Sequence, residues 1–245
     1  MTTNYDPIAE QYQRSKQQPW RTHIESFTLM GLVGNPSGQS VLDVACGEGF
    51  YTRLLRGKGA ARVAGVDLSE GMVQLGRKQE AAHGLGIEYS VGDARDLAFD
   101  GEFDLAVAAY LLNYAPDREE LGRMCRGVAR ALKSGGRFVT VNCNPGLDFS
   151  KAPSYRKYGF ETSVVGELRE GAPITWTFHL ADGSFSIENY HLDIAAHEQC
   201  LRAAGFNQIH WHGPRLAPEG QAEFGDEHWA DFMNHPPAIF LECTK

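Results

Sequence analysis

Two glycines and an acid mark the part of the chain that is best suited to chemistry. The apolar segment 41–44 leads into Gly47 and Gly49, and the next apolar segment ends at Asp67, twenty residues after Gly47. This spacing is typical of a strand, loop, helix and strand that bind a nucleoside, in which an acid at the end of the second strand accepts hydrogen bonds from both ribose hydroxyls. We therefore expect Asp67 to bind a ribose.

The glycine loop differs from one that binds a pyrophosphate. Thr52 occupies the place of the third glycine in the dinucleotide motif, and Glu48 lies between the two glycines at the start of a helix, where its carboxylate would repel an anion. A cationic nucleoside without phosphate suits a loop that is bracketed by Asp43 and Glu48. S-adenosylmethionine carries an ammonium, a sulfonium and a single carboxylate, and it therefore fits this loop.

Apolar periodicity predicts the elements that position these residues. We expect strands at 40–44, 62–66, 87–91, 103–109 and 137–142, with helices at 52–58, 72–83 and 118–132. This alternation favours a parallel sheet with helices on both faces. Two N-terminal helices, broken at Pro19, come first. After Gly146 we expect an aromatic-rich hairpin that turns at 181–184, a helix at 194–203, and closing strands at 208–212 and 238–243.

Five segments carry a family resemblance. In chain order they are D-V-A-C-G-E-G, G-V-D-L-S-E-G-M, V-G-D-A-R-D-L, F-D-L-A-V-A-A-Y-L-L-N-Y and L-K-S-G-G-R-F-V-T, within residues 38–142, a little over two fifths of the chain. Together they resemble the successive motifs of class I S-adenosylmethionine-dependent methyltransferases. The resemblance implies an α/β fold with a Rossmann-like sheet, mostly parallel with an antiparallel last strand, and S-adenosylmethionine as cofactor, which leaves as S-adenosylhomocysteine.

We expect one methyltransferase domain over residues 1–245, a length that can bury one substantial core. It would comprise an N-terminal helical lid (1–34), a cofactor-binding core (38–144), a substrate cap (145–193), and a closing helix and strands (194–245).

The motif positions imply contacts with the cofactor. Asp43 would hold its ammonium side, and the two glycines would let the backbone approach the methionine moiety. Asp93 would accept a hydrogen bond from the adenine amino group. Simpler roles stay open: a helix cap for Asp43, core packing for Leu68 and Met72, and a surface turn for Asp93. The full expected set is Tyr12, Asp43, Ala45, Gly47, Gly49, Asp67, Leu68, Met72, Asp93, Ala94 and Tyr110.

The N-terminal segment Y-D-P-I-A-E-Q-Y resembles the helix that small-molecule methyltransferases fold over the sulfonium, which implies that Tyr5 lies near the transferred methyl group. Tyr5 and His191 are the catalytic candidates, because a hydroxyl or carbon acceptor would need a base. Alternatively, Tyr5 and Tyr12 only attach a terminus to the core. Expected contacts with the acceptor are Tyr5, Asn113, Trp176, Tyr190 and His191.

The aromatic residues of the cap favour a flat, partly apolar acceptor. The N-terminal segment also resembles enzymes of bacterial specialised metabolism, which implies N-methylation of a planar heteroaromatic molecule such as a toxoflavin-type azapteridine. O- or C-methylation of a quinone or polyketide stays open, as does a regulatory module that binds the cofactor without catalysis.

Composition narrows the class of partner. A formal net charge of -8 argues against a nucleic-acid substrate, which needs a basic surface. No apolar run reaches the roughly 18 to 20 residues that span a bilayer, so we expect no membrane contact. Five scattered cysteines without a C-x-x-C pair fit reduced thiols and a cytoplasmic location. We expect no metal, because the spacings of His179, His191, Asp193 and His197 match no standard ligand set.

Overall fold

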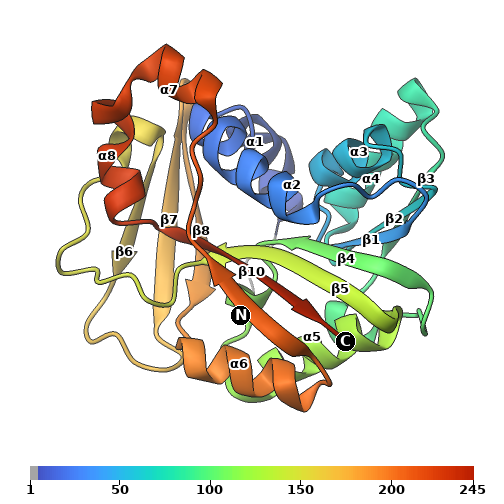
Figure 1. The fold of residues 1–245 in the computed structure, drawn as a ribbon. Helices are drawn as coiled ribbons and strands as arrows, with labels where there is room; N and C mark the ends of the chain where they lie inside the picture. Colours follow the sequence, from blue (N-terminus) through green and yellow to red (C-terminus); the bar gives the residue numbers. More distant parts are fainter. Residues whose placement is uncertain (1–4) are drawn as a thin grey trace.

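A seven-stranded sheet is the centre of the computed structural model, which describes residues 5–245 (Figure 1). Residues 1–4, the beginning of the expected lid, lie outside the described residues. The strand order is β3-β2-β1-β4-β5-β10-β9. The bounds are β1 Ser40–Val44, β2 Arg62–Asp67, β3 Ile87–Val91, β4 Phe103–Ala109, β5 Leu132–Cys143, β9 Asn207–His212 and β10 Ala238–Thr244.

Strand direction confirms the expected sheet. Strands β1 to β5 pair in parallel, and β10 runs antiparallel to both β5 and β9. The central strands are buried on both faces, as the continuous burial of residues 41–44 in β1 shows. Parallel sheets require this cover, because the crossover helices pack on the faces. The predicted α/β fold with an antiparallel last strand is therefore confirmed.

Helices cover the two faces of the sheet (Figure 1). One face carries α1 (Ala9–Ser15), α2 (Phe27–Val33), α3 (Phe50–Gly57) and α4 (Glu70–His83), and the other carries α5 (Arg118–Ala131) and α6 (Ile194–Ala203). Each face has its own buried apolar cluster. Helices α4 and α5 begin where the side chains of Ser69 and Asp117 accept bonds from backbone N–H groups of the first turn. The start of α4 therefore precedes the predicted start at Met72.

A second, three-stranded antiparallel sheet lies beside the main one. It contains β6 (Phe160–Val164), β7 (Pro173–Leu180) and β8 (Gly183–Tyr190), and the β7–β8 pair forms a hairpin at the expected turn. Neither β6 nor α7 (Pro218–Phe224) nor α8 (Asp226–Asn234) was predicted. Helices α7 and α8 bury few of their residues, so their sequences carry little apolar periodicity.

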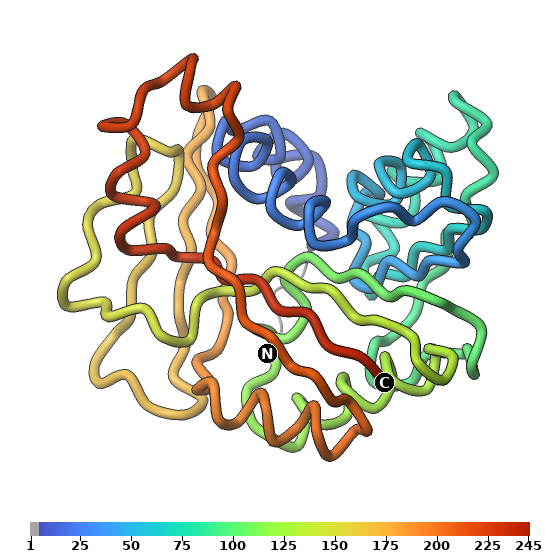
Figure 2. The backbone as a smooth tube through the Cα atoms, in the orientation of Figure 1, coloured from blue at the N-terminus to red at the C-terminus, as the bar shows by residue number. Residues whose placement is uncertain are grey.

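Helices α7 and α8 lie beside the small sheet (Figure 1). Figure 2 shows the chain leaving β9, running to the top of the small sheet and returning as β10. The rings of Tyr158 and Trp229 stack with centroids 5.6 Å apart, and the hydroxyl of Tyr158 donates to the carbonyl of His228 at 2.6 Å. The closing segment thus packs against the chain that leads into the small sheet.

The N-terminal segment connects the two sheets. A short 3-10 turn η1 (Asp6–Ile8) and α1 are followed, after Pro19, by the π-helical segment η2 (Arg21–Ser26), which continues into α2. Gln18 donates to the carbonyl of Gly159 at 2.8 Å, and the ring of Trp20 packs 5.0 Å from that of Phe160. No helix within residues 5–245 is long and apolar enough to cross a membrane.

Candidate active site

A cavity of about 470 Å³ opens at the carboxyl ends of β1, β2 and β4, where ligands of open α/β sheets bind. Its lining includes most of the residues that the sequence predicted: Tyr5, Tyr12, Ala45, Gly47, Asp67, Leu68, Met72, Asp93, Ala94, Tyr110 and Tyr190. The predicted residues Asp43, Gly49, Asn113, Trp176 and His191 do not line it.

Asp67 is the acid at the end of β2. Its Oδ2 accepts from the backbone N–H of Gly47 at 2.8 Å, and its Oδ1 accepts from that of Ser69 at 2.9 Å. A carboxylate oxygen has two acceptor positions, so each oxygen keeps one that can face a ligand hydroxyl. Burial raises the pKa of Asp67 above its ordinary value. This arrangement fits the two ribose hydroxyls of S-adenosylmethionine.

The loop between β1 and α3 contains two glycines, and each position requires glycine for a different reason. Gly47 has a φ of 56°, a conformation that favours glycine, and a side chain there would meet no neighbour. A side chain at Gly49 would collide with the ring of Tyr89. Only Gly47 lines the cavity, and the structure gives Gly49 a packing role against β3.

Asp43 is buried in β1 and does not line the cavity. Its Oδ2 accepts from the hydroxyl of Thr52 in α3 at 2.6 Å. Burial raises the pKa of Asp43 to about 7, despite the bond from Thr52. Its contact with the cofactor ammonium stays a prediction.

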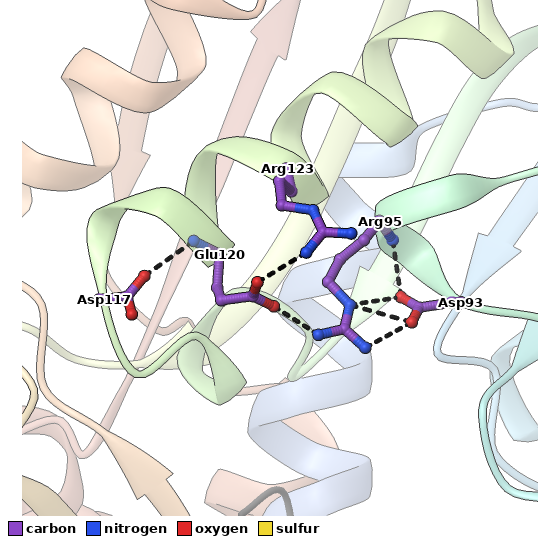
Figure 3. A network of polar contacts seen from close by, with 5 residues as sticks. All are labelled: Asp93, Arg95, Asp117, Glu120 and Arg123. Atoms are coloured by element: carbon purple, nitrogen blue, oxygen red, sulfur yellow. Dashed lines mark hydrogen bonds and ion pairs between the residues drawn. The ribbon is translucent and has the colours of Figure 1, made fainter.

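Asp93 is held by an ion-pair network (Figure 3). Arg95 donates to both oxygens of Asp93 at 2.5 to 2.9 Å, and it also pairs with Glu120 of α5 at 2.5 Å. The bonds from Arg95 lower the pKa of both carboxyls. Arg95 therefore already occupies the acceptor positions with which Asp93 would bind an adenine amino group, and that contact stays a prediction.

Five tyrosines line the cavity, and we refer to them as the tyrosine wall: Tyr5, Tyr12, Tyr110, Tyr114 and Tyr190. The hydroxyls of Tyr5 and Tyr114 are hydrogen-bonded to each other, and the rings of Tyr5 and Tyr12 meet edge to face with centroids 5.1 Å apart. Burial raises the pKa of Tyr5 and Tyr114, so both hydroxyls stay protonated at neutral pH.

Three predicted acceptor contacts lie elsewhere. Trp176 is buried in β7, where it stacks on Phe160 with centroids 5.1 Å apart. Asn113 is buried in the 3-10 turn η4 (Leu112–Tyr114), and within residues 5–245 neither of its amide atoms has a hydrogen-bond partner. His191 lies after β8, where its backbone pairs with Ala172, and burial lowers the pKa of its side chain. Their roles toward the acceptor stay predictions.

The histidines that lie close together in sequence do not form a metal site in the described part of the chain. No group of three or more His, Cys, Asp or Glu residues among residues 5–245 could hold a metal ion. The acid Asp193 caps α6 by accepting from Ala196, and the Nδ1 atom of His197 is bonded to the carbonyl of Asp193 at 2.8 Å.

Several site residues were not predicted. Arg95 and Glu120 form the charged side of the cavity. Glu25 lies behind Tyr110 and accepts from its hydroxyl at 2.6 Å. The pair Arg21 and Glu25, four residues apart in the expected N-terminal helices, is a sequence signal for these buried charges, but the same spacing is common on exposed helix faces.

The known proteins to which the chain is similar are methyltransferases. A family model described as a methyltransferase domain matches residues 41–136. The chain is 27% identical over 173 residues to N-demethylindolmycin N-methyltransferase of Streptomyces griseus, with 69% of this chain and 70% of the relative covered. It is 28% identical over 212 residues to the ubiquinone/menaquinone biosynthesis C-methyltransferase of Desulfotalea psychrophila, with 84% and 79% covered.

The fold is also similar to that of solved structures. A structure of an S-adenosylmethionine dependent methyltransferase from Mesorhizobium loti superposes with a TM-score of 0.66 at 23% identity, covering 94% of this chain and all of that one. At this identity the likeness concerns the fold.

Proposed function

We propose that this S-adenosylmethionine-dependent methyltransferase methylates a ring nitrogen of a small, neutral, planar heteroaromatic acceptor. When bound, the cofactor supplies an electrophilic methyl group on its sulfonium. The protein then has to orient the acceptor nitrogen toward that methyl group and exclude water.

The tyrosine wall is the observation that carries this proposal. Of the charged residues that line the cavity, four come from β2, the segment after β3 and α5, where the nucleoside is expected: Asp67, Asp93, Arg95 and Glu120. Asp6 comes from η1, and the tyrosines come largely from the lid, η4 and β8. Flat rings with polar edges bind planar molecules by stacking and by hydrogen bonds from their hydroxyls. A phosphate or another strongly anionic acceptor would meet no cation among these tyrosines.

The cavity also favours an acceptor that needs no base. The hydroxyls of Tyr5 and Tyr114 stay protonated, and His191 does not line the cavity. The carboxyl of Asp6 does line it, but the bond from the hydroxyl of Ser69 lowers the pKa of Asp6, which makes it a weak base. A heteroaromatic nitrogen attacks the methyl group directly, whereas a hydroxyl or carbon acceptor has to lose a proton.

Within this proposal Tyr5 and Tyr114 orient the acceptor. The lid and the small sheet (145–193) enclose it, and a toxoflavin-type azapteridine in bacterial specialised metabolism is the specific acceptor that we propose. The name of the Streptomyces griseus relative, an N-methyltransferase, supports nitrogen as the target atom.

A second candidate function is O- or C-methylation of a quinone or polyketide. The name of the Desulfotalea psychrophila relative, which assigns it to ubiquinone/menaquinone biosynthesis, favours it. This reaction would need a base, so Tyr5 or His191 would have to reach the acceptor in a different arrangement from the one described.

We also propose that the enzyme works in the cytoplasm on a small molecule and not on nucleic acid. The cysteines Cys46, Cys125, Cys143, Cys200 and Cys243 are all free thiols, which fits a reducing compartment. A net charge of -8 disfavours binding to phosphate backbones.

An acceptor panel tests the proposed function. The purified chain is incubated with S-adenosylmethionine and with an azapteridine, an indole heteroaromatic, a hydroquinone or a phenolic polyketide. Mass spectrometry follows the methylated product and S-adenosylhomocysteine, and NMR identifies the methylated atom. We expect N-methylation of a heteroaromatic member. If the methyl group is transferred only to an oxygen or carbon atom of the quinone or polyketide, the proposed N-methylation is wrong and the second candidate function is favoured.

A further inference from the structure

Glu25 is a fully buried carboxylate that reaches the cavity wall from the lid. It lies in η2, and its side chain is 1% exposed. Its Oε2 accepts from the hydroxyl of Tyr110 and from Nη1 of Arg21, both at 2.6 Å, and its Oε1 accepts from the hydroxyl of Tyr51 at 2.6 Å. The Nζ atom of Lys16 lies 3.6 Å from Oε1. Four groups from three parts of the chain thus converge on one carboxylate.

Tyr110 adopts an unusual backbone conformation at the end of β4. Its φ is 66°, in the left-handed region that bulky residues rarely adopt, and its backbone N–H donates to the carbonyl of Val141 at 2.8 Å. Strain of this kind persists only where surrounding contacts enforce it, and it occurs often at functional sites. The bond from the Tyr110 hydroxyl to Glu25 is such a contact.

The segment that carries Glu25 is irregular in the same place. The π-helical turns of η2 are rare in proteins and occur frequently at functional sites. Arg21, on the same segment, lies against aromatic rings, with its guanidinium 4.2 Å from the ring centroid of Trp20 and 5.3 Å from that of Tyr110. The charge of Glu25 is therefore compensated inside the protein and its position is fixed.

We propose that Glu25 is a positioning residue for methyl transfer, which fixes the Tyr110 ring in the cavity wall and so makes the cofactor site depend on the lid. Tyr110 lines the cavity next to Ala109 and Leu111, beside the end of β1 that carries the glycine loop. Tyr51 makes an equivalent bond to the other oxygen of Glu25 but does not line the cavity. Glu25 acts through Tyr110, and its bond to Tyr51 serves stability.

Binding of S-adenosylhomocysteine tests this proposal without knowledge of the acceptor. Calorimetry is carried out on Glu25→Gln, Tyr110→Phe, the double variant and Tyr51→Phe, with unfolding measured separately for each. Loss of one hydrogen bond to a charged group predicts affinity reduced about tenfold in Glu25→Gln and in Tyr110→Phe. The double variant should be no weaker than either single one, because both changes break the same link. Tyr51→Phe should lose stability and keep its affinity within about twofold.

Three results would overturn the proposal. One is an affinity within about twofold of wild type in folded Glu25→Gln. Another is a loss of affinity in the double variant that equals the sum of the two single losses. The third is an equal loss of affinity in Tyr51→Phe, which would indicate a general packing effect. If Glu25→Gln does not fold, Tyr110→Phe decides alone, since it removes only one hydroxyl, and unchanged affinity in that variant refutes the positioning role.

Discussion

Removal of the Asp67 carboxylate should weaken cofactor binding more than any other single change at the nucleoside end of the cavity. Hydrogen bonds to a charged acceptor contribute about 1.5 to 3 kcal/mol, so Asp67→Ala should raise the dissociation constant of S-adenosylhomocysteine, which carries the same ribose, roughly 10- to 160-fold. The same change leaves the backbone N–H groups of Gly47 and Ser69 without their acceptor. Water can reach a residue that lines the cavity and can replace part of the lost bonding. We therefore expect the free energy of unfolding to fall by about 1 kcal/mol for each N–H group, the lower limit for an unsatisfied buried donor.

The Asp67 experiment needs a control that separates stability from binding. Asp104 provides it, because it also accepts from a backbone N–H, that of Ser40 at 2.9 Å, but lies at the opposite ends of β1 and β4. Asp104→Ala should therefore lose stability and keep cofactor affinity. Asp67→Asn keeps an acceptor oxygen but no charge and should fall between wild type and Asp67→Ala.

Isothermal titration with S-adenosylhomocysteine gives the affinities, and denaturant unfolding with and without ligand gives the stabilities. An affinity of folded Asp67→Ala within about twofold of wild type would refute the ribose assignment. A fall in affinity of the same size in Asp104→Ala would show that the effect is conformational.

Further predictions concern the lid, the buried charges and metals. Tyr5→Phe should lower turnover with little change in cofactor affinity, and Tyr5→Ala should lower it further because the ring also excludes water; unchanged turnover per active site in Tyr5→Ala would remove Tyr5 from the reaction. Burial alone would raise the pKa of Glu25, but Arg21 and Lys16 hold it at about 2, below its ordinary 4.5. A carboxyl with a depressed pKa contributes stability above pH 4.5 and loses it as the pH falls toward 2. The difference in unfolding free energy between wild type and Glu25→Gln should therefore shrink over that interval, and a constant difference from pH 6 to pH 2 would contradict the charge assignment. Excess chelator should leave methyl transfer unchanged; activity lost to chelator and restored by one divalent ion would show that a metal is required.

The sequence predicted the main sheet well because its signals are local. The strands β1, β2 and β4 are short, largely apolar runs and β3 alternates apolar and polar residues, and the bounds of β1, β3 and β4 agree with the structure to the residue. The helices α3 and α4 start two residues before the predicted positions, whereas the starts of α5 and α6 agree with the structure. The apolar periodicity of α7 and α8 is weak because most of their residues are exposed, and both helices were missed.

The sequence by itself determined the end of the cavity at which Asp67 meets the glycine loop. Gly47 and Asp67 meet because adjacent parallel strands end at the same edge of the sheet, so a local motif is enough to place them. The tyrosine wall depended on tertiary structure, since Tyr5, Tyr114 and Tyr190 come from distant segments that only packing brings together. Packing also decided that Glu120 of α5 pairs with Arg95 and that Glu25 is buried behind Tyr110. Charged residues are exposed by default, and only a folded core with compensating cations can bury one.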